Sequence, residues 1–80
     1  MKQRRDDILL KEIARRVKKL REMHGISQAD FLIATDINIG RIELAKFNIT
    51  VSTLKAICDY FEISVSDFLK DIPISEFSNE

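Results

Sequence analysis

Residues 25–43 decide the fold, and they read GISQADFLIATDINIGRIE. Two short, largely apolar segments in this stretch are separated by Thr35-Asp36-Ile37-Asn38, which contains three residues of the types that cap helices or occupy turns. Ser27, followed three residues later by an aspartate, is typical of a helix start. We therefore expect a short helix from Gln28 to about Ala34, a tight turn, and a second short helix from about Asn38 to Ala45.

The residues before this stretch predict one longer helix. From residue 6 to residue 23 the apolar side chains recur at steps of three and four, as one helix face requires, at Leu9, Leu10, Ile13, Val17 and Leu20. Lys and Arg occupy most of the remaining directions. Gly25 supplies the left-handed residue that commonly ends a helix.

The residues after this stretch predict two more helices. Phe47-Asn48-Ile49 is typical of a loop, and Thr50 after it is a suitable N-cap. The helix that follows should present one apolar face, formed by Val51, Leu54, Ile57, Cys58 and Phe61. Ser64 should cap a last short helix with Val65, Phe68 and Leu69 pointing inward. Pro73 should close it, because the residue before a proline avoids helical geometry.

The composition favours one compact all-α domain of five helices. The chain has 80 residues, of which 45% are apolar and 32% charged. It has only two glycines and one proline, which argues against a β-sandwich or β-barrel with many turns. No run approaches the roughly 20 apolar residues that cross a bilayer, which argues against a membrane protein. A single cysteine rules out a disulfide framework and fits a reducing cytoplasm. The expected core consists of Ile13, Val17, Leu20, Phe31, Ile42, Leu54, Ile57, Phe61, Phe68 and Leu69, with Leu32 or Ala34 beside Phe31.

The charges balance in number but not in position. Thirteen Lys/Arg oppose thirteen Asp/Glu. Residues 1–24 have nine of the first and four of the second, a balance of +5, and residues 25–80 have four and nine, a balance of −5. A basic end suits an acidic partner such as nucleic acid, and an acidic end would repel one. The alternative is that the basic stretch is only the solvated face of an amphipathic helix.

The sequence is poor in residues that could catalyse a reaction. His24, the only histidine, precedes the glycine that ends the first helix, where it suits capping. Cys58 lies on an apolar stripe, which favours a small core residue over a nucleophile. One Cys and one His cannot complete the usual four-ligand zinc site, and two glycines do not make a phosphate-binding loop. We expect no enzyme activity, cofactor, metal or small-molecule substrate.

The same chain is better supplied for binding DNA. Two short helices joined by a tight turn, with a helix on either side, are the layout of a helix-turn-helix. In that geometry the first short helix crosses the DNA backbone and the second faces the major groove. Ser27 and Gln28 would then meet a phosphate. Arg41 suits a guanine edge and Asn38 an adenine edge, and Lys46 is the only other cation in this part of the chain.

An ordered series of residues carries a family resemblance over residues 9–70. It includes Gly25-Ile26-Ser27-Gln28, Thr35-Asp36-Ile37-Asn38, Arg41-Ile42-Glu43 and the run from Asn48 to Leu54. The series resembles the Cro/repressor-type helix-turn-helix domain, also called the xenobiotic-response-element or lambda-repressor-like family. The resemblance implies a cytoplasmic, usually dimeric transcriptional regulator that binds double-stranded DNA and is commonly bacterial, plasmid-borne or phage-borne. We expect a basic N-terminal extension over residues 1–5, a helix-turn-helix domain over 6–71 and an acidic tail over 72–80.

The resemblance also implies roles for single residues. Gln28 resembles the glutamine that opens the second helix and holds a phosphate. Glu43 matches a largely structural glutamate, which would pair with Arg21. Lys46 and Asn48 match the loop after the third helix, which often lies near the DNA backbone.

The chain departs from the family pattern in the region of the base contacts. From Ser27 to Glu43 it is about three residues shorter than usual. In one alignment Asp36-Ile37-Asn38 replaces the usual Gly-Val-Ser, and the third helix has lost its first turn. In the other, Thr35 caps the third helix and the loss falls in the second. The first is preferred, because the apolar residues then occupy the family's apolar positions.

Two substitutions affect the third helix itself. Ala45 replaces a glycine that usually follows the glutamate, so a left-handed conformation there would cost roughly 1 kcal/mol or more. Gly40 inside the helix costs about 1 kcal/mol relative to alanine. The helix is therefore expected to be frayed, or shaped for a close approach to its backbone.

The sequence leaves two functions open. The first is a sequence-specific DNA-binding regulator acting as a homodimer, paired through the last helix and Ile72, Ile74 and Phe77. The second is a protein-interaction module, antitoxin-like or a regulatory subunit, that keeps the fold with weak or no DNA binding. The stretch from Ser27 to Thr50 favours the second, because it holds two cations against three carboxylates.

Overall fold

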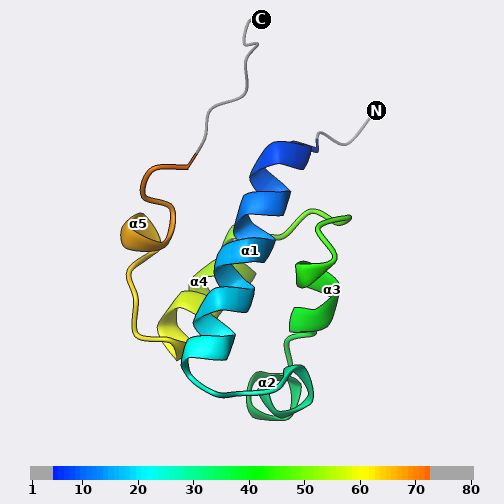
Figure 1. Cartoon of the computed structure of the whole chain (residues 1–80), viewed down its shortest axis with the longest axis vertical. Helices are drawn as coiled ribbons and strands as arrows, with labels where there is room; N and C mark the ends of the chain where they lie inside the picture. The colour runs from blue at the N-terminus through cyan, green and yellow to red at the C-terminus, as the bar shows by residue number, and fades with distance from the viewer. Residues whose placement is uncertain (1–4, 73–80) are drawn as a thin grey trace, which may run out of the picture.

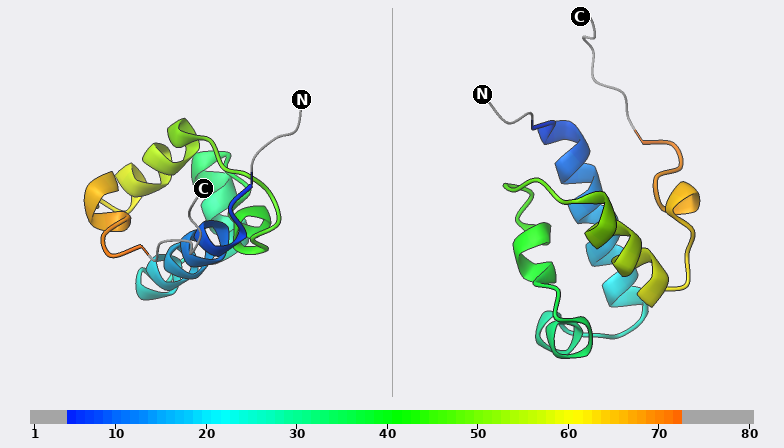
Figure 2. Two further views of the ribbon diagram at one scale, coloured as in Figure 1. Left: turned by 90° about the horizontal axis from the view of Figure 1, so that it is seen from above. Right: turned by 180° about the vertical axis from the view of Figure 1, so that it is seen from behind.

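A computed structural model describes residues 5–72, which form five helices and, within that range, no strand. The helices are α1 (Asp7–Met23), α2 (Gln28–Thr35), α3 (Ile39–Glu43), α4 (Val51–Tyr60) and α5 (Val65–Phe68). α1 runs through the middle of the molecule, with α3 along one side and α5 on the opposite side (Figure 1). The views from above and from behind agree with this placement and show α4 on the side of α1 that faces away from the viewer in Figure 1 (Figure 2). The predicted five-helix, all-α fold with a central helix-turn-helix is confirmed.

Each helix begins at a residue whose side chain caps it. In every case a side-chain oxygen accepts a hydrogen bond from the backbone N–H three residues later, and the capping residues are Asp6, Ser27, Asn38, Thr50 and Ser64. Such a bond satisfies one of the backbone donors that the first turn of a helix leaves without a partner. The predicted starts at Ser27, Thr50 and Ser64 are therefore confirmed. Gly25, with a φ of 64°, follows α1 in the left-handed conformation expected of it.

The core lies where α1, α2, α3, α4 and α5 meet. Its buried cluster consists of Ile13, Val17, Phe31, Ile39, Leu54, Ile57, Cys58, Phe61 and Phe68. The rings of Phe31 and Phe61 are stacked with their centroids 5.5 Å apart. Of the expected core residues, Leu20, Ile42 and Leu69 are only partly buried and pack against this cluster from its edge.

Three expectations about burial are wrong. Leu32 is 41% exposed and Ala34 is exposed too, because the eight residues of α2 bury only Phe31. Val51 is 79% exposed, because it stands at the first position of α4, on the rim of an open apolar groove. Ile39 is absent from the expected core but is fully buried, since it is the residue that α3 turns toward the other helices.

None of the helices within residues 5–72 combines the length and the apolar character that crossing a membrane requires. Pro73, Ile74 and Phe77, to which the sequence assigned a helix stop and a dimer contact, lie outside the described residues.

Candidate nucleic-acid interface

The turn between α2 and α3 distinguishes the two alignments that the sequence leaves open. Thr35 is the last residue of α2, and Asp36 follows it in the left-handed conformation, with a φ of 61°. Asn38 then caps α3, which has only five residues. This is the first of the two alignments, in which Asp36-Ile37-Asn38 stands for Gly-Val-Ser. α3 therefore begins only after Asn38, and its expected span from Asn38 to Ala45 is too long at both ends.

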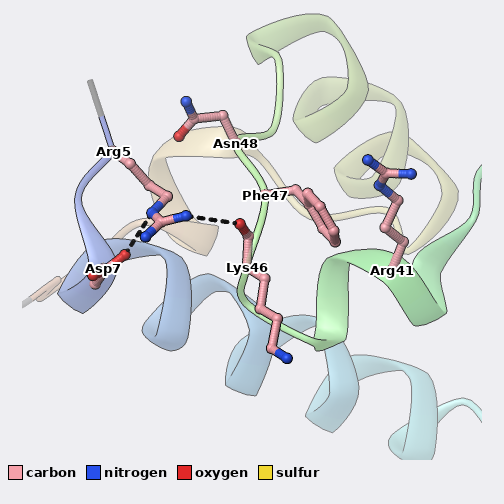
Figure 3. A pocket seen from close by; sticks show the side chains of 6 residues that line it. All are labelled: Arg5, Asp7, Arg41, Lys46, Phe47 and Asn48. Carbon is pink, nitrogen blue, oxygen red and sulfur yellow. Dashed lines mark hydrogen bonds and ion pairs between the residues drawn. The ribbon is translucent and has the colours of Figure 1, made fainter. Parts of the chain in front are cut away.

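The end of α3 is set by backbone conformation. Ala45 has a φ of 59°, in the left-handed region that an alanine side chain disfavours. Its N–H donates to the carbonyl oxygen of Ile42 at 3.0 Å, which closes the last turn. The chain then reverses into the loop of Lys46, Phe47 and Asn48 (Figure 3).

A largely buried ion pair holds α3 against α1. Arg21 Nε lies 2.8 Å from Glu43 Oε2, and Arg21 Nη2 donates to Glu43 Oε1 at 3.2 Å. The two side chains are only 13% and 7% exposed. The hydrogen bond to Glu43 raises the pKa of Arg21 above its usual value. The predicted pairing is confirmed, and the charge of Glu43 is neutralised inside the molecule.

Gln28 reaches across from α2 to the same carboxylate. Its Nε2 donates to Glu43 Oε1 at 3.0 Å, and its Oε1 lies over Gly40, where a Cβ would stand 3.0 Å from it. Gly40 thus admits a close approach, one of the two possibilities that the sequence left for it. The amide nitrogen carries two hydrogens, and the contact with Glu43 uses one of them. Phosphate binding by Gln28 stays a prediction.

Two more predicted contact residues are helix caps. Ser27 Oγ accepts from the N–H of Asp30 at 3.0 Å, and Asn38 Oδ1 accepts from the N–H of Arg41 at 3.1 Å. In both caps the side-chain oxygen is the acceptor. The hydroxyl hydrogen of Ser27 and the side-chain NH2 group of Asn38 can therefore donate to a ligand. Their contacts with DNA stay predictions.

The three remaining predicted residues come together in one open pocket of about 630 Å³ (Figure 3). It is lined by Arg5, Asp7, Arg41, Lys46, Phe47 and Asn48, which come from the start of α1, from α3 and from the loop after α3. Three of these six residues are cations, and all six are exposed. The pocket therefore presents guanidinium, ammonium and amide donors on one face, which are the groups that bind phosphate oxygens and base edges.

Three residues of this pocket, Arg5, Asp7 and Phe47, were not foreseen as site residues from the sequence. Arg5 Nε lies 2.9 Å from Asp7 Oδ1, and Arg5 Nη1 donates to the carbonyl oxygen of Lys46 at 3.3 Å, so the chain before α1 is tied to the loop after α3. Phe47 lies against Arg41, whose Cζ is 3.9 Å from the ring centroid. An aromatic residue in an otherwise polar, exposed loop was the available signal for Phe47. The 41-residue separation of Arg5 and Lys46 leaves no local signal for their contact.

Cys58 and His24, the residues considered for catalysis, both contact other parts of the fold. Cys58 is fully buried, and desolvation raises the pKa of its thiol. His24 Nδ1 lies 2.9 Å from the carbonyl oxygen of Leu20 at the end of α1, and its ring centroid is 4.8 Å from that of Phe61. Among residues 5–72, no three His, Cys, Asp or Glu side chains gather as a metal site would need.

Comparison with known proteins gives one match. A family model described as the Cro/C1-type HTH DNA-binding domain matches residues 16–73. The matched range starts within α1 and includes α2, α3, α4 and α5. No curated protein and no solved structure matches the chain.

Proposed function

Because the chain belongs to the Cro/C1-type helix-turn-helix DNA-binding domain family, we propose that it is a cytoplasmic, sequence-specific transcriptional regulator. The observation that carries the proposal is the gathering of Arg41, Lys46 and Asn48 on one face, at α3 and the loop after it. In a helix-turn-helix this is the face that meets DNA.

The proposed contacts divide into two kinds. Arg41, exposed on α3, reads a guanine through its O6 and N7, and Asn38 reads an adenine. Lys46 and Asn48 hold phosphates beside α3. Ser27 and Gln28 hold a phosphate at the start of α2, where backbone N–H groups and the helix dipole favour an anion.

We further propose that the regulator acts as a homodimer. α3 is five residues long, so one copy reads few base pairs, and a second copy about 34 Å away doubles the site. An open apolar groove of about 370 Å³ supports this pairing, because Leu69 and Ile72 line it together with Leu9 and Leu10 of α1. The sequence assigned Ile72, Ile74 and Phe77 to the dimer contact, and of these three Ile72 lies within the described residues.

The test is the salt dependence of binding to random-sequence duplex DNA. Neutralising about six phosphates gives a slope of log affinity against log salt near −5, because each contact releases counterions. Fluorescence anisotropy with a labelled duplex, at salt concentrations from about 50 to about 300 mM, measures the slope. A flat response would contradict DNA binding.

The second candidate is a protein-interaction module, and exposed apolar side chains favour it. Ile33 on α2 is 82% exposed and Leu44 after α3 is 60% exposed. The charge argument for it is weaker in the structure than in the sequence, because one of the three carboxylates, Glu43, is paired with Arg21. The flat salt response that contradicts the regulator is the result that this candidate requires.

A further inference from the structure

Phe47 differs from the other phenylalanines of the described chain. Phe31, Phe61 and Phe68 are all buried in the core, whereas Phe47 is 43% exposed and lies on the cationic face, outside the core cluster. Leaving an aromatic ring half in water forgoes hydrophobic stabilisation. Its position therefore requires an explanation other than core packing.

The contact that Phe47 makes is with Arg41. The guanidinium carbon lies over the ring at 3.9 Å from its centroid, well within the roughly 6 Å over which a cation is attracted to an aromatic face. Figure 3 shows the ring of Phe47 directed from the loop toward Arg41 on α3. The reversal of the chain at Ala45 is what brings the two side chains together.

The contact leaves the hydrogen-bonding capacity of Arg41 intact. The five N–H donors of a guanidinium lie in its plane, and a ring beneath the cation occupies none of them. Within residues 5–72, no hydrogen bond or ion pair engages the guanidinium of Arg41. The side chain is thus held in place with its donors available to a ligand.

We propose that Phe47 is a specificity-determining residue, which positions the Arg41 guanidinium for bidentate contact with one guanine. This inference rests on the proposed function. α3 has only five residues, and Arg41 is the one cation among them. A long side chain loses much rotamer freedom on binding, and a contact that orders it beforehand reduces that loss.

The first test examines the pair in the free protein. A proton held over an aromatic face resonates upfield, so the Arg41 side-chain Nε–H and Cδ–H signals should be displaced upfield in NMR spectra of the wild type. In Phe47→Leu they should return to ordinary positions, and in Phe47→Trp the displacement should persist. Signals at ordinary positions in the wild type would overturn the proposal whether or not the protein binds DNA.

The second test measures discrimination on DNA. Selection from a pool of random duplexes defines the preferred site of the wild type, and binding to this duplex and to its single base-pair variants is then measured. Phe47→Leu should lose about two- to fivefold affinity for the preferred duplex, with the loss confined to the base pair at which Arg41→Ala abolishes discrimination. Phe47→Trp should retain discrimination, and adding Phe47→Leu to Arg41→Ala should cost nothing more.

Matched controls separate this role from others. Met23→Ala, at the last residue of α1, changes an apolar side chain that is 69% exposed and lies in the groove beside α5, and it should leave discrimination and affinity unchanged. A loss by Phe47→Leu that is equal on preferred and random duplexes, or that adds to that of Arg41→Ala, would overturn the positioning role while DNA binding stands. A wild type that binds no duplex in a salt-dependent manner would overturn the proposed function instead.

Discussion

Ala45 has a left-handed backbone conformation, which favours glycine over alanine. At a φ of 59° its Cβ crowds the backbone, which costs roughly 1–2 kcal/mol. A glycine relieves this crowding but adds freedom to the unfolded chain, which returns part of the gain. We predict that Ala45→Gly raises the free energy of unfolding in urea by about 0.5–1 kcal/mol.

Ala56→Gly is the matched control for this prediction. Ala56 is an exposed residue in the middle of α4, where a glycine has no crowding to relieve and lowers stability by about 1 kcal/mol. The same substitution should therefore act in opposite directions at the two positions. Destabilisation of similar size at both would show that Ala45 is unstrained.

Glu12 provides a second prediction at the residue scale, through pH. Its carboxylate accepts hydrogen bonds from Arg15 and from Arg16, at distances as short as 2.6 and 2.7 Å. The hydrogen bond from Arg15, and next that from Arg16, lower the pKa of Glu12 from 4.5 to about 2. A carboxylate whose pKa is lower in the folded state stabilises the fold above its unfolded pKa, and this contribution is lost as the pH falls to the folded pKa.

The wild type should therefore be more stable than Glu12→Gln at pH 6, and the difference should shrink between pH 4.5 and about 2. Urea midpoints of both proteins over a pH series measure it. Glu22→Gln, which removes a carboxylate from the same helix without touching Arg15 or Arg16, controls for the change in net charge. A difference that stays constant down to pH 2 would rule out the ion pair as its source.

At the scale of elements, one side chain of α1 binds the end of α5 and the residues that follow it. Arg16 Nη1 donates to the carbonyl oxygens of Phe68 and Lys70, each at 2.6 Å, and Nη2 donates to that of Asp71 at 3.4 Å. These carbonyls lie at the last residue of α5 and just after it. α5 has only four residues and makes few hydrogen bonds of its own. Charge-assisted bonds to such groups are stronger than neutral ones.

We predict that Arg16→Met lowers the free energy of unfolding by about 1–3 kcal/mol, because these carbonyls lose their charged donor. Arg15→Met is the control, since Arg15 shares Glu12 with Arg16 but is mostly exposed and has no hydrogen bond to α5 among those of the described residues. It should cost much less. Equal losses in urea unfolding would assign the effect to Glu12 and not to α5.

The elements also show what a sequence can predict. The starts at Ser27, Thr50 and Ser64 were predictable because a cap is a bond between residues three apart. Most core residues were predictable from the spacing of apolar residues for a similar reason, since that spacing depends on residues three or four apart. The full burial of Ile39 and the exposure of Val51 were not predictable, because each depends on which neighbouring element covers it.

The candidate site was predictable in part. The spacing of the family resemblance indicated the pairing of Arg21 with Glu43 and the loop of Lys46 and Asn48. The contact between Arg41 and Phe47 was not indicated, because it depends on the reversal at Ala45, and a left-handed alanine has no sequence signature. The contact of Arg5 with Lys46 likewise exists only once the helices are packed.

At the scale of the whole molecule, the opposed charges of the two halves are partly matched to each other. Arg21 of the basic half pairs with Glu43, and Arg16 binds the carbonyls after α5. Arg15, Arg16 and Lys19 line a groove beside Asp67 and Phe68 of α5. α5 and α3 lie on opposite sides of α1 (Figures 1 and 2), so the groove beside α5 lies away from the face proposed to meet DNA.

The structure therefore predicts which cations determine the salt dependence of binding. Lys46→Ala removes a cation from the pocket at α3 and should reduce the slope of log affinity against log salt by about one, uniformly across sequences. Lys19→Ala removes the same charge from the groove beside α5 and should leave the slope unchanged, because that groove lies away from the face proposed to meet DNA. Both residues are exposed lysines, so neither change should disturb the fold and the net charge changes equally. A slope reduced by Lys19→Ala but not by Lys46→Ala would place DNA against α1 and α5, and would remove Arg41 and Phe47 from the interface.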